Sequence, residues 1–166
     1  MAFYTIGTGI GGGLVINGNL IYGQDGYAGE FGHGGNFQNE HECTCGLKHC
    51  IEPVSSATGI ERALTKHFKK ETTLESVAQD FINGDIKIKE IIKKALIPLA
   101  HHIATIELAI NPEAIIIGGG PTAMGEPLRK LIEENVKEVQ LDFISSSTPI
   151  LLATTKNDAG VYGAAY

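Results

Sequence analysis

All three cysteines of this 166-residue chain, Cys43, Cys45 and Cys50, lie within eight residues. They fall in residues 23–52, where glycine and polar residues are too frequent for a regular helix or strand. A loop of that length inside a compact domain is uncommon unless it is functional or cross-linked. A secreted disulfide framework normally has an even number of cysteines, so three of them fit metal ligation better. The segment therefore predicts a loop that is held together by a metal ion.

Zinc is the metal that this cluster favours, because zinc takes four tetrahedral ligands from thiolates and imidazoles. Three cysteines leave one position open, and His33, His41 and His49 are all close in sequence. The spacing does not choose among these three histidines. A closed four-ligand site would be structural and would order a loop with little apolar content of its own. The alternative is three unconnected thiols.

The composition predicts one compact domain. Hydrophobic residues make up 43% of the chain and charged residues 19%, which excludes a disordered chain, a collagen and a coiled coil. The net charge of −6 argues against a nucleic-acid-binding face, which would be basic. We see no stretch that is long and apolar enough to span a membrane and no secretory signal, so we expect a soluble cytoplasmic protein without membrane contacts.

The first part of the chain predicts a three-stranded antiparallel meander. Its strands are expected at residues 2–6, 13–17 and 19–22, with turns at 9–12 and 17–19. Helical periodicity begins after Ser56, a predicted N-cap, and places Ile60, Leu64 and Phe68 on one face.

The rest of the chain alternates helices and strands. We expect helices at 73–82, at 86–110 with a kink at Pro98, at 124–139 and from Ala159 onward, and strands at 114–117 and 150–153. This β-β-β-α-β-α-β-α order predicts an α/β half domain of the ribonuclease-H-like or actin-like kind, with a mixed sheet and flanking helices. Such halves face each other across a nucleotide cleft, so one copy suggests half of an enzyme.

Glycine is concentrated at the start of the chain. Residues 1–46 contain 13 of the 21 glycines and no lysine or arginine. An anion bound here would therefore be held by backbone N–H groups, which glycines allow to converge on a phosphate. The candidate residues for such a site are Gly7, Thr8, Gly9, Gly11 and Gly12. The segment leads into a strand, whereas a dinucleotide fingerprint or a Walker loop leads into a helix, so it is neither of these motifs. The alternative to a phosphate site is a bulged hairpin that binds no ligand.

Three polar residues flank the cysteine cluster. Glu30 and His33 precede it, and Glu52 follows Cys50 by two residues. If a metal ties the loop together, these side chains converge, and ionised carboxylates are suited to accept hydrogen bonds from the hydroxyls of a sugar. The alternative is that both glutamates are ordinary surface acids.

Five segments together resemble the C-terminal domain of the ROK family of bacterial sugar kinases and repressors. The resemblance runs over essentially the whole chain, and the cysteine motif with its trailing glutamate is its most specific part. Within the family, Val54-Ser55-Ser56-Ala57-Thr58-Gly59 looks most like the glucokinase branch. The five segments are Gly7-Thr8-Gly9-Ile10-Gly11-Gly12-Gly13, Ala28-Gly29-Glu30-Phe31-Gly32-His33, Cys43-x-Cys45-Gly46-x-x-x-Cys50-x-Glu52, Ile116-Ile117-Gly118-Gly119-Gly120 and Asp158-Ala159-Gly160-Val161-Tyr162-Gly163-Ala164-Ala165.

The resemblance implies an ATP-dependent hexose kinase, with glucose as the expected substrate and ATP with Mg²⁺ as co-substrate. Residues 7–12 would cradle the ATP phosphates, and Gly118, Gly119 and Gly120 would lie beside the adenosine. The residue at His33 would both complete a structural zinc site with Cys43, Cys45 and Cys50 and contact the sugar. Glu30 and Glu52 would bind sugar hydroxyls, and the family implies homodimers or homotetramers.

This sequence departs from the family pattern in two ways. The family usually has glycine where this chain has His49, which makes His49 a rival zinc ligand. The family's N-terminal domain is missing, with its Asp-x-Gly-Gly-Thr phosphate motif and the aspartate that acts as general base. Residues 1–166 would therefore be the C-terminal domain, with the zinc loop within residues 33–50, and we expect negligible turnover from this chain alone.

Two other functions are compatible with the same residues. In the first, the chain is the effector-binding domain of a ROK repressor, which binds a sugar through Glu30, His33 and Glu52 while another segment binds DNA. In the second, it is a zinc-stapled domain with no remaining ligand function. The glycine hairpin favours the kinase, because a pure sugar sensor has no need of a phosphate cradle.

Overall fold

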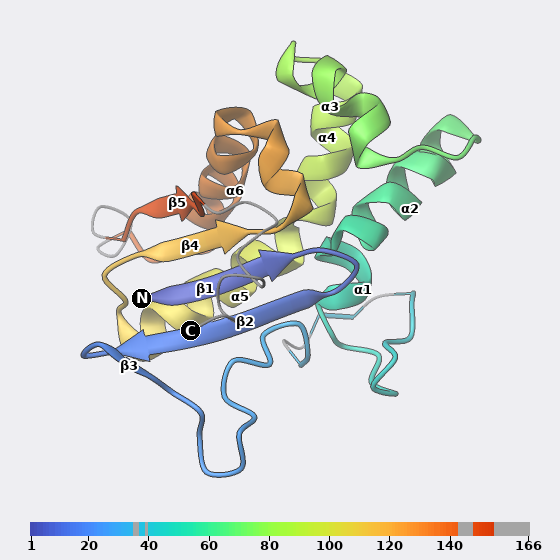
Figure 1. The fold of residues 1–166 in the computed structure, drawn as a ribbon. Helices are drawn as coiled ribbons and strands as arrows, with labels where there is room; N and C mark the ends of the chain where they lie inside the picture. Colours follow the sequence, from blue (N-terminus) through green and yellow to red (C-terminus); the bar gives the residue numbers. More distant parts are fainter. Residues whose placement is uncertain (35–36, 39, 143–147, 155–166) are drawn as a thin grey trace.

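The molecule is built on a five-stranded mixed sheet with the strand order β3-β2-β1-β4-β5 (Figure 1). The computed structural model describes residues 1–34, 37–38, 40–142 and 148–154. β1 (Ala2–Ile6), β2 (Ile10–Ile16) and β3 (Asn19–Leu20) form the predicted antiparallel meander. β4 (Ile115–Gly118) and β5 (Ile150–Leu152) run parallel to β1. The predicted α/β class with a mixed sheet is confirmed.

The first turn is shorter than the sequence predicts. The expected turn at residues 9–12 is wrong, because β2 already begins at Ile10 and pairs Gly11 with Thr5 and Gly12 with Tyr4. The turn itself is closed by the Gly7 N–H, which donates to the carbonyl of Gly9 over 2.9 Å. A glycine run is compatible with both turn and strand, so composition alone could not place the boundary.

Three helices follow the long irregular segment. They are α1 (Glu52–Ser55), α2 (Ala57–Phe68) and α3 (Leu74–Ile82). Ser56 caps α2 as predicted, because its side chain accepts a hydrogen bond from the N–H of Gly59. Ile60 and Leu64 are fully buried, whereas Phe68, at the end of the same face, is exposed.

The predicted long helix over residues 86–110 is in fact two helices. They are α4 (Ile86–Ala95) and α5 (Ile97–Ile110), which meet at Leu96. Pro98 lies in the first turn of α5, where a missing N–H costs nothing, so it starts a helix instead of bending one. Asn111 ends α5 in a left-handed conformation, with a φ of 41°.

The segment after β4 also differs from the expectation. Gly120 to Met124 form the 3₁₀ helix η1 (Gly120–Met124), and α6 (Glu126–Val139) begins only after Gly125, whose φ of 64° breaks the helix. The predicted final helix from Ala159 lies outside the described residues.

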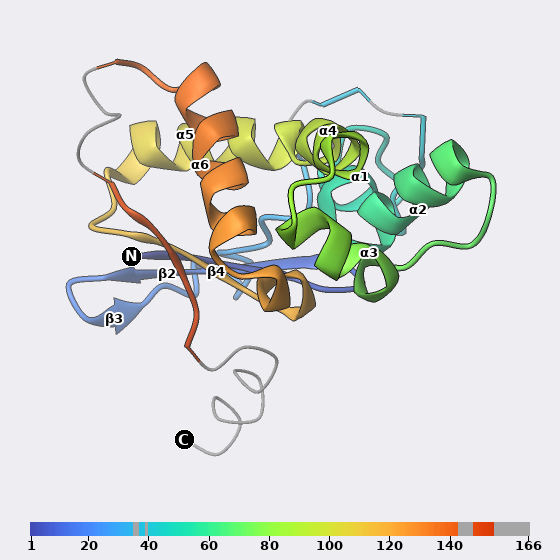
Figure 2. The same cartoon turned by 90° about the horizontal axis from the view of Figure 1, so that it is seen from above.

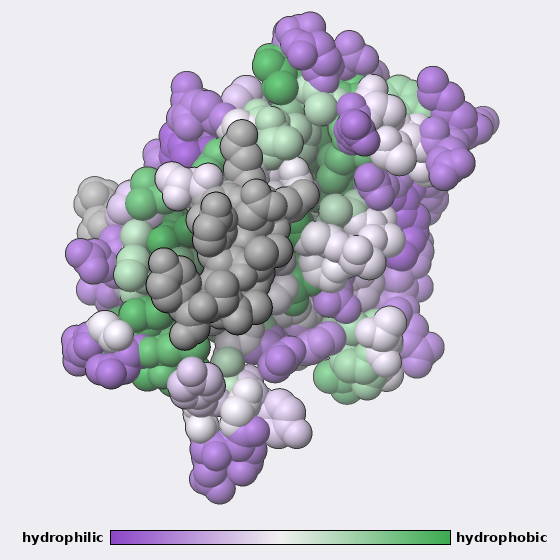
Figure 3. All heavy atoms as spheres, in the orientation of Figure 1, coloured by the Kyte–Doolittle hydropathy of each residue, from purple (hydrophilic) through white to green (hydrophobic). Residues whose placement is uncertain are grey.

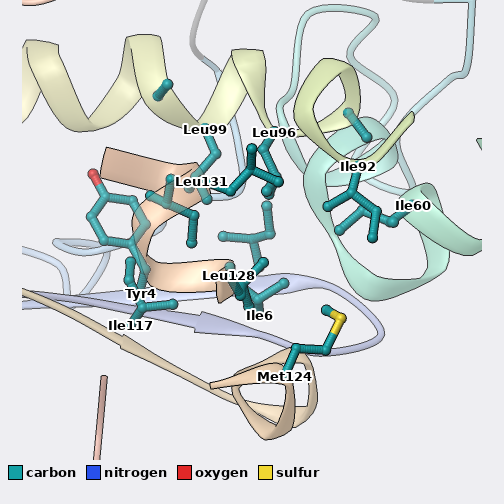
Figure 4. Packing of buried hydrophobic residues seen from close by; sticks show 14 of the residues in the cluster. Tyr4, Ile6, Ile60, Ile92, Leu96, Leu99, Ile117, Met124, Leu128 and Leu131 are labelled. Carbon is teal, nitrogen blue, oxygen red and sulfur yellow. The ribbon is translucent and has the colours of Figure 1, made fainter. Parts of the chain in front are cut away.

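The core lies between one face of the sheet and the helices α5 and α6 (Figure 2), and it continues between α2, α3 and α4. Alternation along β1 turns Ala2, Tyr4 and Ile6 toward these helices, where they pack with side chains such as Leu99 and Leu131 (Figure 4). Apolar residues reach the surface at the β3 end of the sheet, where Leu20 is 50% exposed (Figure 3). Among the described helices, none has the length and apolar character needed to cross a membrane.

We expect Leu99→Ala to lower the free energy of unfolding by about 2–5 kcal/mol, because Leu99 is fully buried and its truncation leaves a cavity. Leu108→Ala is the matched control, since Leu108 lies on the same helix and is 58% exposed; its effect should stay within about 0.5 kcal/mol. Chemical denaturation of the two variants measures both values, and equal effects would contradict the placement of the core.

Candidate functional site

The two glycine segments lie side by side at one end of the sheet. Because β1 and β4 are parallel and pair Thr5 with Gly118, the turns that follow them leave the sheet together. Gly119 has a φ of 95°, and a Cβ at this position would collide with the backbone of Ile6. The N–H of Ala57, the first residue of α2, donates to the carbonyl of Gly7 over 2.8 Å. The hairpin, the β4 turn and the start of α2 therefore converge.

The segment from Gly29 to His33 lies directly on β2. A Cβ at Gly12 would collide with the ring of Phe31 and would lie 2.6 Å from the carbonyl oxygen of Gly29. A Cβ at Gly29 would lie 2.8 Å from the carbonyl oxygen of Gly12. A Cβ at Gly32 would collide with the carbonyl oxygen of Ile10. Glycine is therefore required on both sides of this contact, at Gly12 in the strand and at Gly29 and Gly32 in the loop.

Phe31 anchors this segment in the core. Its ring packs 4.9 Å from the ring of Tyr4 and 5.2 Å from that of His102. The hydroxyl of Tyr4 and Nδ1 of His102 are hydrogen-bonded over 2.8 Å. Burial lowers the pKa of His102, so this imidazole favours the neutral form. The predicted sugar-binding segment is thus fixed by an aromatic cluster that joins β1, α5 and the loop.

Glu52 connects the loop to the hairpin. Its Oε2 accepts a hydrogen bond from the N–H of Ile10 over 3.0 Å, and a Cβ at Gly9 would occupy the place of this oxygen. Its Oε1 lies 3.7 Å from Sγ of Cys43. The backbone N–H of Glu52 donates to Gly32 over 3.0 Å. One residue at the start of α1 therefore touches the turn, the loop and the cysteine cluster.

The structure brings together His33, Cys43, Cys45 and Cys50. One ligand atom from each lies within 4.8 Å of the others. Sγ of Cys43 is 3.5 Å from Nδ1 of His33, and Sγ of Cys45 is 3.5 Å from Sγ of Cys50. Of the three candidate histidines, all within the described residues, His33 joins this group, whereas His41 and His49 do not.

The environments of the cysteines differ. Burial raises the pKa of the Cys50 thiol to about 12, whereas a backbone hydrogen bond at Leu47 lowers the pKa of the exposed Cys45. A bound cation would stabilise both thiolates. Three thiols and one imidazole at these separations match the donor set that zinc prefers.

Glu30 lies at the outer edge of this group. Its carboxylate Oε2 is 3.9 Å from Nε2 of His33, and its side chain is 63% exposed. His33 therefore has Cys43 near one ring nitrogen and Glu30 near the other. Glu30, His33 and Glu52 thus line one continuous strip of the loop, with Cys43 between the histidine and Glu52.

A cavity of about 390 Å³ opens beside the β4 turn. Its walls are largely apolar, and two carboxylates, Glu61 and Glu75, lie among them. Glu61 is partly engaged, since its Oε1 accepts a hydrogen bond from the N–H of Leu74 over 2.9 Å. Sequence reasoning identified the turn but missed the cavity, because its walls come from separate helices. The lining residues are Ala57, Glu61, Leu74, Glu75, Ala78, Gly120, Pro121, Ala123 and Met124.

Comparison with known proteins identifies relatives along the whole chain. The model of the ROK family matches residues 1–166. The chain is 35% identical to a glucokinase from Halalkalibacterium halodurans, over 98% of this chain and 54% of the relative. It is 31% identical to an N-acetylmannosamine kinase from Yersinia pestis, over 99% of this chain and 55% of the relative. The chain therefore spans about half the length of the curated relatives it matches.

Solved structures show the same fold. A ROK family glucokinase from Streptomyces griseus, in complex with glucose and AMPPNP, superposes with a TM-score of 0.88 at 23% identity, over 99% of this chain and 58% of that one. A ROK family transcriptional regulator superposes with a TM-score of 0.78 at 25% identity, over 91% of this chain and 41% of that one. The fold is the actin-like one of ROK sugar kinases.

We expect Gly12→Ala to lower the free energy of unfolding by about 1–3 kcal/mol, because the new methyl group would overlap Phe31 and the backbone of Gly29. Gly11→Ala is the matched control, since a Cβ at the neighbouring strand position meets nothing within 4 Å; its effect should stay within about 0.5 kcal/mol. Urea unfolding followed by tyrosine fluorescence compares them. Equal stability of the two variants would show that the loop does not lie on β2.

Proposed function

This chain belongs to the ROK family, and we propose that it forms the C-terminal domain, residues 1–166, of an ATP-dependent hexose kinase. The proposed reaction transfers the γ-phosphate of ATP to glucose and yields glucose 6-phosphate and ADP. The observation that carries the proposal is the bridge made by Glu52, because it places a candidate sugar ligand against the backbone of the glycine hairpin. We call the strip of Glu30, His33 and Glu52 the sugar edge. Phosphoryl transfer requires a sugar hydroxyl to be held next to the ATP phosphates, so a phosphate cradle in contact with the sugar edge suits this reaction.

The proposed sugar site consists of Glu30, His33 and Glu52. Ionised carboxylates accept hydrogen bonds from hydroxyl groups, and two of them on one edge can hold neighbouring hydroxyls of a ring. Glu30 is exposed and available for such contacts, and Glu52 has its position fixed by the N–H of Ile10. Glucose is the proposed hexose because of the glucokinase relative, and the N-acetylmannosamine kinase relative is the reason to test a second sugar.

The proposed nucleotide site runs from the hairpin to the β4 turn. Backbone N–H groups of residues 7–9, with the hydroxyl of Thr8 and the glycines at 11 and 12, would face the phosphates. The adenosine would occupy the 390 Å³ cavity beside Gly118, Gly119 and Gly120, which is apolar enough for a base. Glu61 and Glu75 would accept hydrogen bonds from ribose hydroxyls there.

The proposed metal is a structural zinc ion held by His33, Cys43, Cys45 and Cys50. When bound, zinc supplies a four-ligand cross-link that would fix a loop without regular secondary structure. His33 and Glu30 would then be held in place from the metal side, and Glu52 from the hairpin side. In this arrangement the metal orders the sugar edge and takes no part in the chemical step.

The general base is proposed to come from another part of the kinase, so this chain alone should give negligible turnover.

A sugar-sensing regulator is the second candidate, because a ROK transcriptional regulator shares the fold over 91% of this chain. The two functions differ in whether the hairpin binds a nucleotide.

We expect the zinc-loaded chain to bind both glucose and Mg·ADP in calorimetric titrations. Glu30→Gln should weaken glucose about tenfold, because it removes a charged acceptor, and should leave ADP binding unchanged. Glu90→Gln, a substitution of an exposed glutamate on α4, is the control. Binding of glucose without ADP would favour the regulator, and binding of neither would contradict both functions.

We expect purified chain to contain one zinc ion per molecule and His33→Ala to weaken its retention at least about tenfold, because the substitution removes one of four ligands. His49→Ala should retain the metal, since His49 is exposed and outside the group. Elemental analysis and competition with a chromogenic chelator measure both. A stronger loss of zinc in His49→Ala would show that the wrong histidine has been assigned.

A further inference from the structure

A second and larger cavity is lined by residues of the helices α1, α2 and α4. Its volume is about 660 Å³, within the range of small-molecule sites. It shares no lining residue with the cavity beside the β4 turn. Its lining residues are His41, Pro53, Val54, Gly59, Arg62, Ala63, Lys66, His67, Ile91, Lys94 and Ala95.

The charged groups at this cavity are all basic. Arg62, Lys66 and Lys94 line it, and no acidic residue is found among its described lining residues, although the chain as a whole carries a net charge of −6. Lys66 has a loose ion pair with Glu40 at 3.7 Å, in which both side chains are 81% exposed. Such an exposed pair contributes little and is readily displaced by a stronger anion.

Arg62 and Lys94 have no ion pair within the described part of the chain. Arg62 donates from Nη1 to the carbonyl of Pro53 over 3.1 Å, which orients the guanidinium beside α1. On the same helix as Lys94, Lys89 and Lys93 are paired with glutamates of α6 at 3.5 and 2.6 Å. The cations on the α6 side of α4 are therefore neutralised, whereas Lys94, which lines the cavity, has no ion pair within the described residues.

The walls between these cations are apolar. Pro53 and Val54 come from α1, Ala63 from α2, and Ile91 and Ala95 from α4. A ligand that matches both features has a phosphate group for the cations and an apolar ring or chain for the walls, since a guanidinium binds phosphate oxygens in a forked geometry. A simple inorganic ion would leave the apolar walls unused.

We propose that the cavity between α1, α2 and α4 is a binding site for a small phosphomonoester with an apolar body, held by Arg62, Lys94 and Lys66. The site does not depend on the proposed kinase activity, because none of its lining residues belongs to the hairpin, the sugar edge or the cysteine group.

Isothermal titration of the zinc-loaded chain with phenyl phosphate tests the proposal, with inorganic phosphate and phenol as partial ligands. No nucleotide is added, because ADP itself combines phosphate groups with a ring and would compete for this cavity; the variants described next separate it from any phosphate binding at the hairpin. We expect phenyl phosphate to bind with a stoichiometry of one and at least about tenfold more tightly than either partial ligand, because only it satisfies both cations and walls.

The double variant Arg62→Gln/Lys94→Gln should weaken phenyl phosphate at least about tenfold, since it removes two charged donors. The matched control Lys87→Gln/Lys130→Gln also removes two cations, from exposed positions of α4 and α6, and should leave binding unchanged. Circular dichroism checks that both variants are folded, and Arg62→Lys/Lys94→Arg should restore most of the affinity.

Three results would overturn the proposal. The first is no binding of phenyl phosphate up to millimolar concentration. The second is equal binding by the glutamine variant and the control, which would place the anion elsewhere. The third is equal affinity for phenyl phosphate and inorganic phosphate, which would show that the cations bind any anion and that the apolar walls do not contribute.

Discussion

The contact between strand β2 and the segment from Gly29 to Gly32 is the constraint on which the whole site depends. Two backbones approach each other there so closely that side chains are excluded on both sides. Within the described residues the loop from Gly23 to Ile51 has no helix or strand, so it has no hydrogen-bond ladder of its own. Its position is set by this contact, by the ring of Phe31 in the core and by the cysteine group at its end.

Glu52 connects this loop to the glycine hairpin. It follows the last cysteine, begins α1 and touches the hairpin through the N–H of Ile10. A carboxylate in this position can respond to both parts of the proposed reaction, since a sugar hydroxyl and a backbone N–H are competing donors for its oxygens. The geometry thus connects the order of the loop with the position of the glycine hairpin.

Much of the fold follows from local signals in the sequence. Ser56 and Thr73 begin their helices by capping, and Asn111 ends α5, because these effects involve neighbouring residues alone. The turn over residues 9–12 and the single helix over 86–110 with a kink at Pro98 were wrong, because glycine fits turn and strand equally and proline can start a helix as well as bend one. The gathering of His33 with the cysteines, and the bond from Ile10 to Glu52, depend on how distant segments pack. Spacing alone does not contain that information.

The contact between Gly9 and the carboxylate of Glu52 has a consequence for how the domain can be engineered. Because a methyl group there would displace the carboxylate of Glu52, the two positions behave as one unit although 43 residues separate them in the chain. A chimera whose borrowed hairpin carries a side chain at position 9 would need a matching change at position 52. Effects of substitutions at these two positions should accordingly be non-additive, which makes the pair suitable for a double-mutant cycle.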